Sequence, residues 1–176
     1  QQVHTESGDA ISAMVDPYSY RKSLTMPKMI FIGTNDEYWP VDAIKNYLDS
    51  IPGENYIHYV PNAGHDLGGG EQAIKALSAF WGQTLTNSQY PSCKWDAVKE
   101  DNKVSINVAG TEGKVLAAYL WMADSEDRDF RDEEWKSADL KVNGEANFTR
   151  KIGLPKSGFR AFYVDLKYED SNGGDY

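Results

Sequence analysis

The sequence predicts an α/β fold in its first half and an all-β sandwich in its second half. Two short apolar runs at residues 29–32 and 56–60 are separated by a stretch with helical spacing, which is typical of strands joined by a crossover helix. Beyond a polar segment at 87–91, apolar residues recur at every second position, as in half-buried strands. We therefore expect an α/β part at 1–86, a linker at 87–91 and a β-sandwich at 92–176.

The first half is expected to begin with a short helix and a buried strand. A weak apolar periodicity up to Val15 is stopped by Asp16-Pro17, because proline disfavours helical backbone in the residue before it. The strand at 29–32 has four consecutive apolar residues, which indicates a strand covered on both faces, and Gly33 ends it.

A helix, a strand and a second helix are expected to follow. Pro40 fits the first turn of a helix that extends to Ile51, with apolar residues on one face. The strand at 56–60 is rich in aromatic and β-branched residues, and the next helix occupies residues 71–85. Strands joined in this way run parallel with right-handed crossovers, so a parallel sheet is predicted.

The second half is expected to hold five or six strands and no helix. Asn143-Gly144, between two alternating runs, is a strong hairpin signal. The pattern matches part of an immunoglobulin-like or fibronectin-like sandwich, which usually has about seven strands. Because residues 170–176 have the composition of a turn, the last strand is expected to be missing. The expected strands are 104–108, 115–123, 135–142, 146–154 and 159–168.

Composition excludes several classes of partner. The formal net charge is −9, from 27 acidic and 18 basic residues, and no stripe of Lys and Arg is present, so nucleic acid is excluded. No run approaches the ~18 apolar residues that a membrane span needs. A single cysteine, Cys93, excludes an internal disulfide, and no cofactor is expected.

Asp36 and His65 are the candidate catalytic residues. Each follows a predicted strand at its C-terminal end, where open α/β sheets place their active sites. In α/β-hydrolases the chain order is nucleophile, acid, histidine, and these two residues fit the last two positions. Residues 1–86 are therefore expected to be the C-terminal part of an α/β-hydrolase-type parallel sheet. No serine here lies in a G-x-S-x-G elbow, so the nucleophilic serine is expected upstream of Gln1.

Five short segments carry a resemblance to a known family. They are Asp16-Pro-Tyr-Ser-Tyr-Arg21, Leu24-Thr-Met-Pro-Lys28, Asp36-Glu37, Pro52-Gly-Glu54 and Tyr59-Val-Pro-Asn-Ala63. With them the chain resembles the C-terminal portion of the PhoPQ-activated pathogenicity-related protein family, closely from residue 16 to about 67 and more loosely beyond. The resemblance implies a secreted or envelope-associated bacterial protein of α/β-hydrolase type with an added β domain. It matches Asp36 to the acid loop and His65 to the histidine loop.

Other residues offer alternatives to this pair. Asp36 could instead cap the helix that Pro40 begins, and Glu37 and Asp66 are alternative acids. Asp66 ranks lower, because side chains of adjacent residues seldom face each other.

Three further features have a structural explanation that we favour. His58 lies inside a strand, where a packed or surface role is more common than catalysis. Cys93 could serve as a thiol nucleophile, but its place after the linker favours a buried or idle cysteine. The glycines at 68–70 lack the spacing and the Lys of a phosphate-binding loop, and we interpret them as a hinge.

The second half contains two candidate binding features. The acidic loop at 124–134 lacks the Gly and the closing Glu of an EF-hand calcium loop, and arginines within it compete for the carboxylates, so a solvated loop is favoured. A set of aromatic residues could form a sugar-binding face, although most fall on alternating positions that a sandwich core would use. These aromatics are Trp95, Trp121, Trp135, Phe148 and Tyr163.

Two functions follow from these observations. The first is the C-terminal part of a serine hydrolase that cleaves an ester or amide in a small or glycan-linked substrate, with this chain inactive by itself. The second is a non-catalytic virulence-associated protein that binds a glycan or protein through a hydrolase-like scaffold and the β domain. Because a truncated sheet leaves an edge unburied, the missing N-terminal part or a second copy of the chain is the expected partner.

Overall fold

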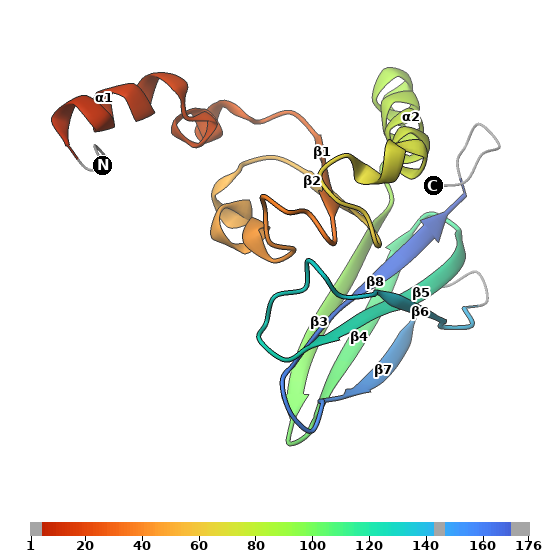
Figure 1. The fold of residues 1–176 in the computed structure, drawn as a ribbon. Helices are drawn as coiled ribbons and strands as arrows, with labels where there is room; N and C mark the ends of the chain where they lie inside the picture. The colour runs from red at the N-terminus through yellow and green to blue at the C-terminus, as the bar shows by residue number, and fades with distance from the viewer. Residues whose placement is uncertain (1–4, 143–146, 170–176) are drawn as a thin grey trace. The chain divides into compact units, whose positions relative to one another are not determined.

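The computed structural model describes residues 5–142 and 147–169 (Figure 1). The chain divides into two compact units. The first unit comprises residues 1–30 and 42–57. The second unit comprises residues 31–41 and 58–176 and contains both candidate catalytic residues.

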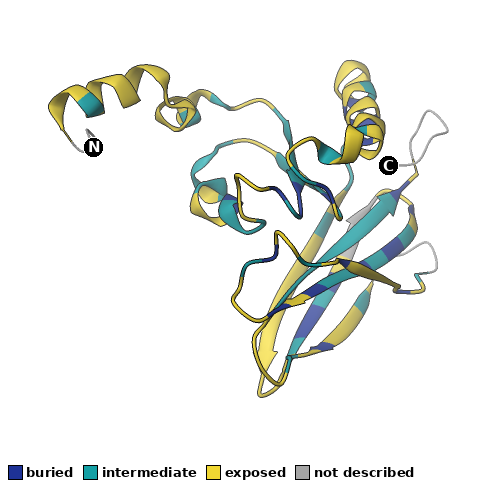
Figure 2. Cartoon of the chain, viewed as in Figure 1, coloured by how far each residue is buried: buried dark blue, intermediate teal, exposed yellow. Residues whose placement is uncertain are grey.

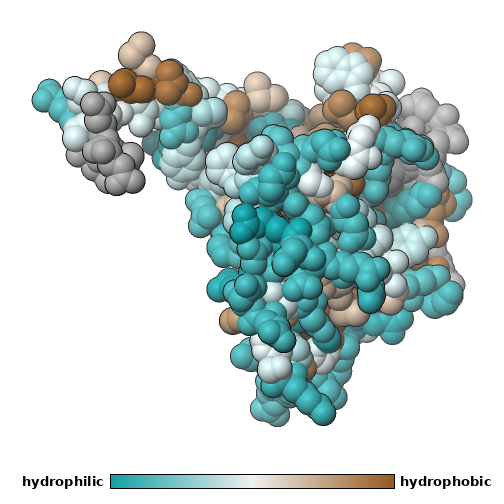
Figure 3. Space-filling model, viewed as in Figure 1, coloured by the Kyte–Doolittle hydropathy of each residue, from teal (hydrophilic) through white to brown (hydrophobic). Residues whose placement is uncertain are grey.

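The first unit begins with an exposed amphipathic helix. The α1 helix (Glu6–Val15) starts at Thr5, whose side chain accepts a hydrogen bond from Gly8 N at 3.1 Å, and it ends at Asp16-Pro17 as predicted. A 3₁₀ helix, η1 (Pro17–Ser23), follows directly. No residue of α1 is buried, and Figure 2 shows the helix mostly exposed. Apolar side chains gather over α1 on the face shown in Figure 3.

The helix expected from Pro40 to Ile51 does not form. In its place are two short 3₁₀ helices, η2 (Ala43–Asn46) and η3 (Leu48–Ser50). Neither has a side-chain hydrogen bond at its N-terminus, and Asn, Asp, Ser and Tyr in this stretch are weak helix formers. The apolar spacing alone was therefore insufficient to make an α-helix.

The two strands predicted in the first half of the sequence form a two-stranded sheet. It pairs β1 (Lys28–Gly33) with β2 (Asn55–Val60). At one end Lys28 N donates to Glu54 O, and at the other Thr34 N donates to Val60 O. Both bonds join residues with the same sequence separation, as parallel strands do.

The fold-class prediction, an α/β-hydrolase-type sheet followed by an immunoglobulin-like sandwich, is wrong. The described residues are mostly strands in three small sheets, two of them antiparallel, with few helices. Among the described residues the expected parallel sheet is a single pair of strands, and 3₁₀ turns stand where a crossover helix was predicted.

The second α-helix agrees with the prediction. A 3₁₀ helix, η4 (Leu67–Gly69), leads into α2 (Glu71–Thr86). One face of α2 buries small alanines together with Phe80 and Gln83. Large apolar residues on the remaining face are exposed, namely Ile74, Leu77, Trp81 and Leu85.

Two antiparallel sheets of three strands each make up the remainder of the second unit (Figure 1). One has the order β3-β4-β7 and the other the order β6-β5-β8. The strands are β3 (Ser92–Glu100), β4 (Lys103–Glu112), β5 (Val115–Ser125), β6 (Lys136–Asp139), β7 (Phe148–Gly153) and β8 (Phe159–Tyr168).

Residues of β5 contribute to two hydrophobic cores. Ala118 and Leu120 belong to a core that also takes residues from β4, β7 and β8, so it lies between the two sheets. Ala123 belongs to a second core with Phe130 and Trp135. Figure 2 shows buried residues concentrated on these strands.

The predicted hairpin around Asn143-Gly144 is wrong. The turn itself lies outside the described residues, as do the expected turn at 170–176 and the start of the chain before Thr5. The flanking strands belong to different sheets, because β6 pairs with β5 whereas β7 pairs with β4.

None of the helices in the described ranges is both long and apolar enough to cross a membrane.

Candidate active site

Two loops of the second unit lie against each other at the ends of β1 and β2. We call residues 34–39 the acid loop and residues 61–66 the histidine loop. A Cβ atom on Gly33 would lie only 2.3 Å from the carbonyl oxygen of Gly64, so the backbones approach as closely as a glycine allows.

Backbone and side-chain hydrogen bonds hold the two loops together. Asn35 N donates to Ala63 O at 2.9 Å. The hydroxyl of Thr34, which is 1% exposed, accepts a hydrogen bond from Asn62 N at 2.8 Å and donates to Asn35 Oδ1 at 2.7 Å. The relative position of the loops is therefore fixed by buried polar contacts.

Asp36 is buried in the acid loop, and its carboxylate accepts three hydrogen bonds. Its Oδ1 atom accepts from Tyr38 N at 2.8 Å and from Trp39 N at 3.0 Å. Its Oδ2 atom lies 2.8 Å from Nδ1 of His65. The backbone amides thus fix the carboxylate so that Oδ2 faces the imidazole.

The surroundings of Asp36 keep it ionised. Burial by itself would raise the pKa of Asp36, but the hydrogen bonds from His65 and from the amides of Tyr38 and Trp39 outweigh burial and lower the pKa below its usual 3.8. At neutral pH the group is a carboxylate, which can only accept a proton in a hydrogen bond.

One ring nitrogen of His65 is hydrogen-bonded to Asp36, and the rest of the ring is largely exposed. Because the carboxylate only accepts, Nδ1 must carry the proton, and Nε2 of the neutral ring is left with a lone pair. The side chain is 56% exposed, and Nε2 has no hydrogen bond to the part of the chain that is described. The hydrogen bond to Asp36 also raises the pKa of His65 above its usual 6.5.

An aromatic residue of the acid loop contacts this pair, and a second one follows it in the chain. The ring of Tyr38 lies edge-on to the imidazole of His65, with centroids 5.1 Å apart and planes at 86°. Tyr38 and Trp39 are 67% and 63% exposed, although both rings are large and apolar. An apolar surface therefore adjoins the imidazole.

The alternative acids contact other groups. Glu37 Oε2 accepts a hydrogen bond from His65 N at 3.3 Å, and Asp66 Oδ1 accepts one from Gly68 N at 3.0 Å, where it caps η4. Of the three candidate acids, Asp36 is the one in contact with the ring of His65. The predicted pair is thus brought together at hydrogen-bond distance.

His58 and Cys93 are packed against other side chains, as residues with a structural role are. The His58 ring is 5.6 Å from that of Phe31, and burial lowers the pKa of His58. Cys93 packs beside the core between the sheets, where burial raises the pKa of its thiol and disfavours the thiolate. The glycines at 68–70 all have positive φ, and Gly70 is the N-cap residue of α2.

Carboxylates of the acidic loop pair with one arginine of the loop, as the sequence indicated, and with a second arginine from β8, which was not predicted. Arg131 pairs with Asp129, and Arg160 of β8 pairs with Asp124. No group of three or more His, Cys, Asp or Glu side chains suited to a metal ion occurs within residues 5–142 and 147–169.

Most of the candidate sugar-binding aromatics are core residues. Trp135 is 3% exposed, Trp121 and Tyr163 pack beside it, and Phe148 packs against the core between the sheets. Trp95 differs, because it is 69% exposed on β3.

Three residues that support the site were not predicted. Asn35 and Arg131 link the acid loop to the loop after β5, and Asn62 links the histidine loop to Trp135. Their partners across these contacts are 73 to 98 positions away in the sequence, and no local pattern signals such contacts.

Comparison with known proteins places the chain in a family. Residues 1–131 match the family described as PhoPQ-activated pathogenicity-related protein. Autocrine proliferation repressor protein A of Dictyostelium discoideum is similar, with 29% identity over 181 residues that cover 90% of this chain and 36% of that protein. The chain therefore spans about a third of the length of this curated relative. No solved structure matches.

Proposed function

The chain belongs to the PhoPQ-activated pathogenicity-related protein family, and we propose that it supplies the acid and the base of a serine-hydrolase site acting on an ester or amide. His65 is the general base and acid, Asp36 orients it, and the serine comes from a part of the protein outside this chain. The observation that carries the proposal is the 2.8 Å contact of Asp36 Oδ2 with His65 Nδ1, beside an exposed imidazole.

The chemistry follows from the two edges of the imidazole. Nε2 accepts the serine hydroxyl proton as the serine oxygen bonds to the substrate carbonyl carbon. The imidazolium then returns this proton to the leaving alcohol or amine as the carbon–oxygen or carbon–nitrogen bond breaks. Asp36 stays ionised throughout and stabilises the positive charge on His65. A water molecule repeats the sequence to release the acid.

The electrostatics of the pair support this role. A pKa of His65 above its usual value, caused by the hydrogen bond and charge of Asp36, makes the imidazole a stronger base. The proposal depends on the geometry of these residues rather than on the fold class, because acid–histidine pairs of this kind recur on unrelated folds.

The exposed aromatics favour a substrate with an apolar group beside the bond that is cleaved. Tyr38 contacts the imidazole edge-on, so a carbonyl held near Nε2 would have its neighbouring substituent within reach of this ring. The ring of Tyr38, which is 67% exposed, would bury apolar surface against such a group.

The cellular location that we propose rests on family membership alone. We extend the proposal to a secreted or envelope-associated protein, with the remainder of the same protein or a second copy of the chain as partner.

A second candidate function is a non-catalytic one, in which the protein acts by binding a glycan or another protein. The relative from Dictyostelium is named for the repression of proliferation, which is a regulatory activity, and this name favours the alternative.

Labelling of the full-length protein with a serine-reactive fluorophosphonate distinguishes the two functions. We expect the unchanged protein to be labelled, and His65→Ala to lose labelling rate by at least about a thousandfold. His58→Ala is the matched control, since this second histidine packs against Phe31, and it should label normally. Equal rates for His65→Ala and the unchanged protein would remove His65 from the mechanism, and no labelling at all would favour the binding function.

A further inference from the structure

We propose that residues 129–135, between β5 and β6, are the positioning element of the Asp36–His65 pair, with Arg131 and Asn35 as positioning residues. We call residues 129–135 the β5–β6 segment. The catalytic meaning of the inference rests on the proposed function, whereas the effect on the geometry of the pair does not.

The β5–β6 segment holds the acid loop on both sides of Asp36. The residue before it, Asn35, donates through Nδ2 to Arg131 O at 3.0 Å and to Glu133 O at 2.8 Å. The residue after it, Glu37, accepts at its backbone oxygen a hydrogen bond from Arg131 Nη1 at 3.2 Å. Hydrogen bonds with the β5–β6 segment therefore hold the backbone on both sides of Asp36 in place.

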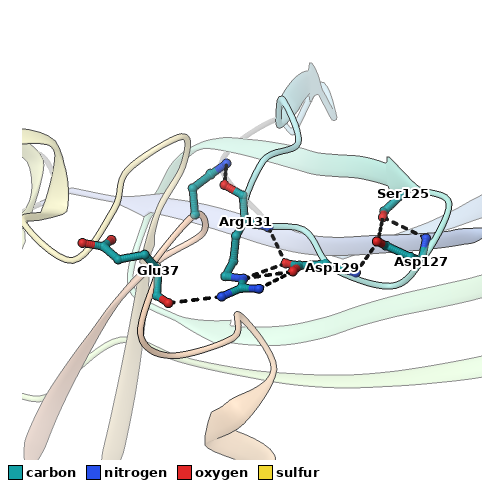
Figure 4. A network of polar contacts seen from close by, with 6 residues as sticks. Glu37, Ser125, Asp127, Asp129 and Arg131 are labelled. Carbon is teal, nitrogen blue, oxygen red and sulfur yellow. Dashed lines mark hydrogen bonds and ion pairs between the residues drawn. The ribbon is translucent and has the colours of Figure 1, made fainter.

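Arg131 is itself held in a defined orientation (Figure 4). Its Nε donates to both carboxylate oxygens of Asp129, at 2.8 and 3.0 Å, and Nη2 pairs with the same carboxylate. Asp129 N donates to Asp127 Oδ1, which also accepts from the hydroxyl of Ser125. Ser125 is the last residue of β5, so the network runs from a rigid strand to the acid loop.

The other end of the β5–β6 segment holds the histidine loop. Trp135 N donates to Asn62 Oδ1 at 2.7 Å, and Asn62 Nδ2 donates to Trp135 O at 3.0 Å. Trp135 is 3% exposed in the core that it shares with Phe130 and Ala123. One segment anchored in a core thus contacts both loops that meet in the Asp36–His65 hydrogen bond.

Positioning of this kind matters because His65 is exposed. A contact in which one of the two side chains is 56% exposed to solvent adds little stability by itself. Its geometry must therefore come from the backbones that carry the residues, and a displacement of about 1 Å is enough to lower an enzymatic rate about a hundredfold.

The sign of the change in the pKa of His65 separates positioning from a simple charge effect. If Arg131 acts only through its positive charge, its removal relieves repulsion and raises the pKa of His65. If Arg131 positions the acid loop, its removal weakens the Asp36 contact and lowers the pKa of His65 toward its usual 6.5.

The test is an NMR titration of His65 in this chain and its variants. In Arg131→Ala and Asn35→Ala we expect a downward shift of the pKa and a larger share of the Nε2–H tautomer. Arg131→Lys keeps the charge but lacks the planar fork that spans Asp129 and the Glu37 carbonyl, so it should shift in the same direction.

Arg160→Ala is a matched control. Arg160 also pairs with an aspartate through Nε and Nη2 and donates from Nη1 to a backbone oxygen, but these partners are Asp124 and Gly153. We expect no change in the His65 tautomer in this variant. An unchanged or raised pKa in Arg131→Ala, or an equal fall in Arg160→Ala, would overturn the inference. A fall confined to the Arg131 and Asn35 variants upholds it even where the full-length protein fails to react with a fluorophosphonate.

Discussion

The replacement Gly33→Ala tests whether the close approach of the two loops creates the Asp36–His65 contact. The added Cβ would lie 2.3 Å from Gly64 O and 2.5 Å from Ala63 O. Both neighbours are backbone atoms, and Cβ contacts below 3.0 Å essentially do not occur. The acid loop and the histidine loop must therefore separate by at least about 0.7 Å, the difference between 2.3 and 3.0 Å.

A separation of this size would break hydrogen bonds between the two loops and so lower the free energy of unfolding. The bond from Asn35 N to Ala63 O, now 2.9 Å long, would exceed hydrogen-bond distance, as would the 2.8 Å contact between Asp36 and His65. Overpacking costs about 1–3 kcal/mol, and each lost hydrogen bond about 0.5–1.5 kcal/mol. We expect Gly33→Ala to lower the free energy of unfolding by about 2–6 kcal/mol.

Urea unfolding of this chain measures the effect, and Gly153→Ala is the control. A Cβ at Gly153, in β7, would meet nothing within 4 Å, so the same change of residue should alter the free energy of unfolding by less than about 1 kcal/mol. The tautomer of His65, observed by NMR, gives a second measurement that reports on the pair directly. Equal stability of the two variants, with the Nδ1–H tautomer retained in Gly33→Ala, would refute the reasoning.

Two further predictions concern pH and association. The pKa of Asp36 is lowered in the folded chain, so this residue contributes stability that is complete above pH 3.8 and is lost as the pH falls through the lowered pKa. The pKa of His65 is raised in the folded chain, so this residue contributes stability that is complete below pH 6.5 and is lost as the pH rises through the raised pKa. Urea titrations should therefore show the largest stability difference between the chain and its Asp36→Asn variant between pH 3.8 and 6.5, and a difference that keeps growing above 6.5 would contradict the linkage. Leu77 and Trp81 are exposed on α2, so Leu77→Gln with Trp81→Gln should reduce self-association in size-exclusion chromatography while changing stability by less than about 1 kcal/mol. Unchanged association of the double variant would exclude this face of α2 as the contact.

The candidate pair was accessible from the sequence because its signal is local. Asp36 and His65 each follow a short apolar run that forms a strand, β1 or β2, and the strands lie side by side. Residues that follow neighbouring parallel strands at the same end must come close, so the contact could be expected without a structure. The helices α1 and α2 were predicted for the same reason, since capping and apolar spacing are properties of a few consecutive residues.

The fold class was not accessible because it depends on which elements form and pair. The stretch 40–51 has helical spacing but forms two 3₁₀ helices, and this removes the expected crossover helix. The strand β3 was not expected, because it is almost entirely exposed and lacks an alternating apolar pattern. The strands β6 and β7 joined different sheets despite the turn signal between them.

The groups of the candidate site can be read from the amino-acid sequence: a carboxylate and an imidazole, each shortly after a strand, with no serine in a nucleophile elbow. How the two are held, through Asn35, Asn62 and Arg131 of the two loops and the β5–β6 segment, is visible only in the folded chain. The difference arises from distance along the chain. Strand ends and helix caps are set by neighbouring residues, whereas a hydrogen bond to a backbone oxygen 73 to 98 positions away exists only once the cores have packed.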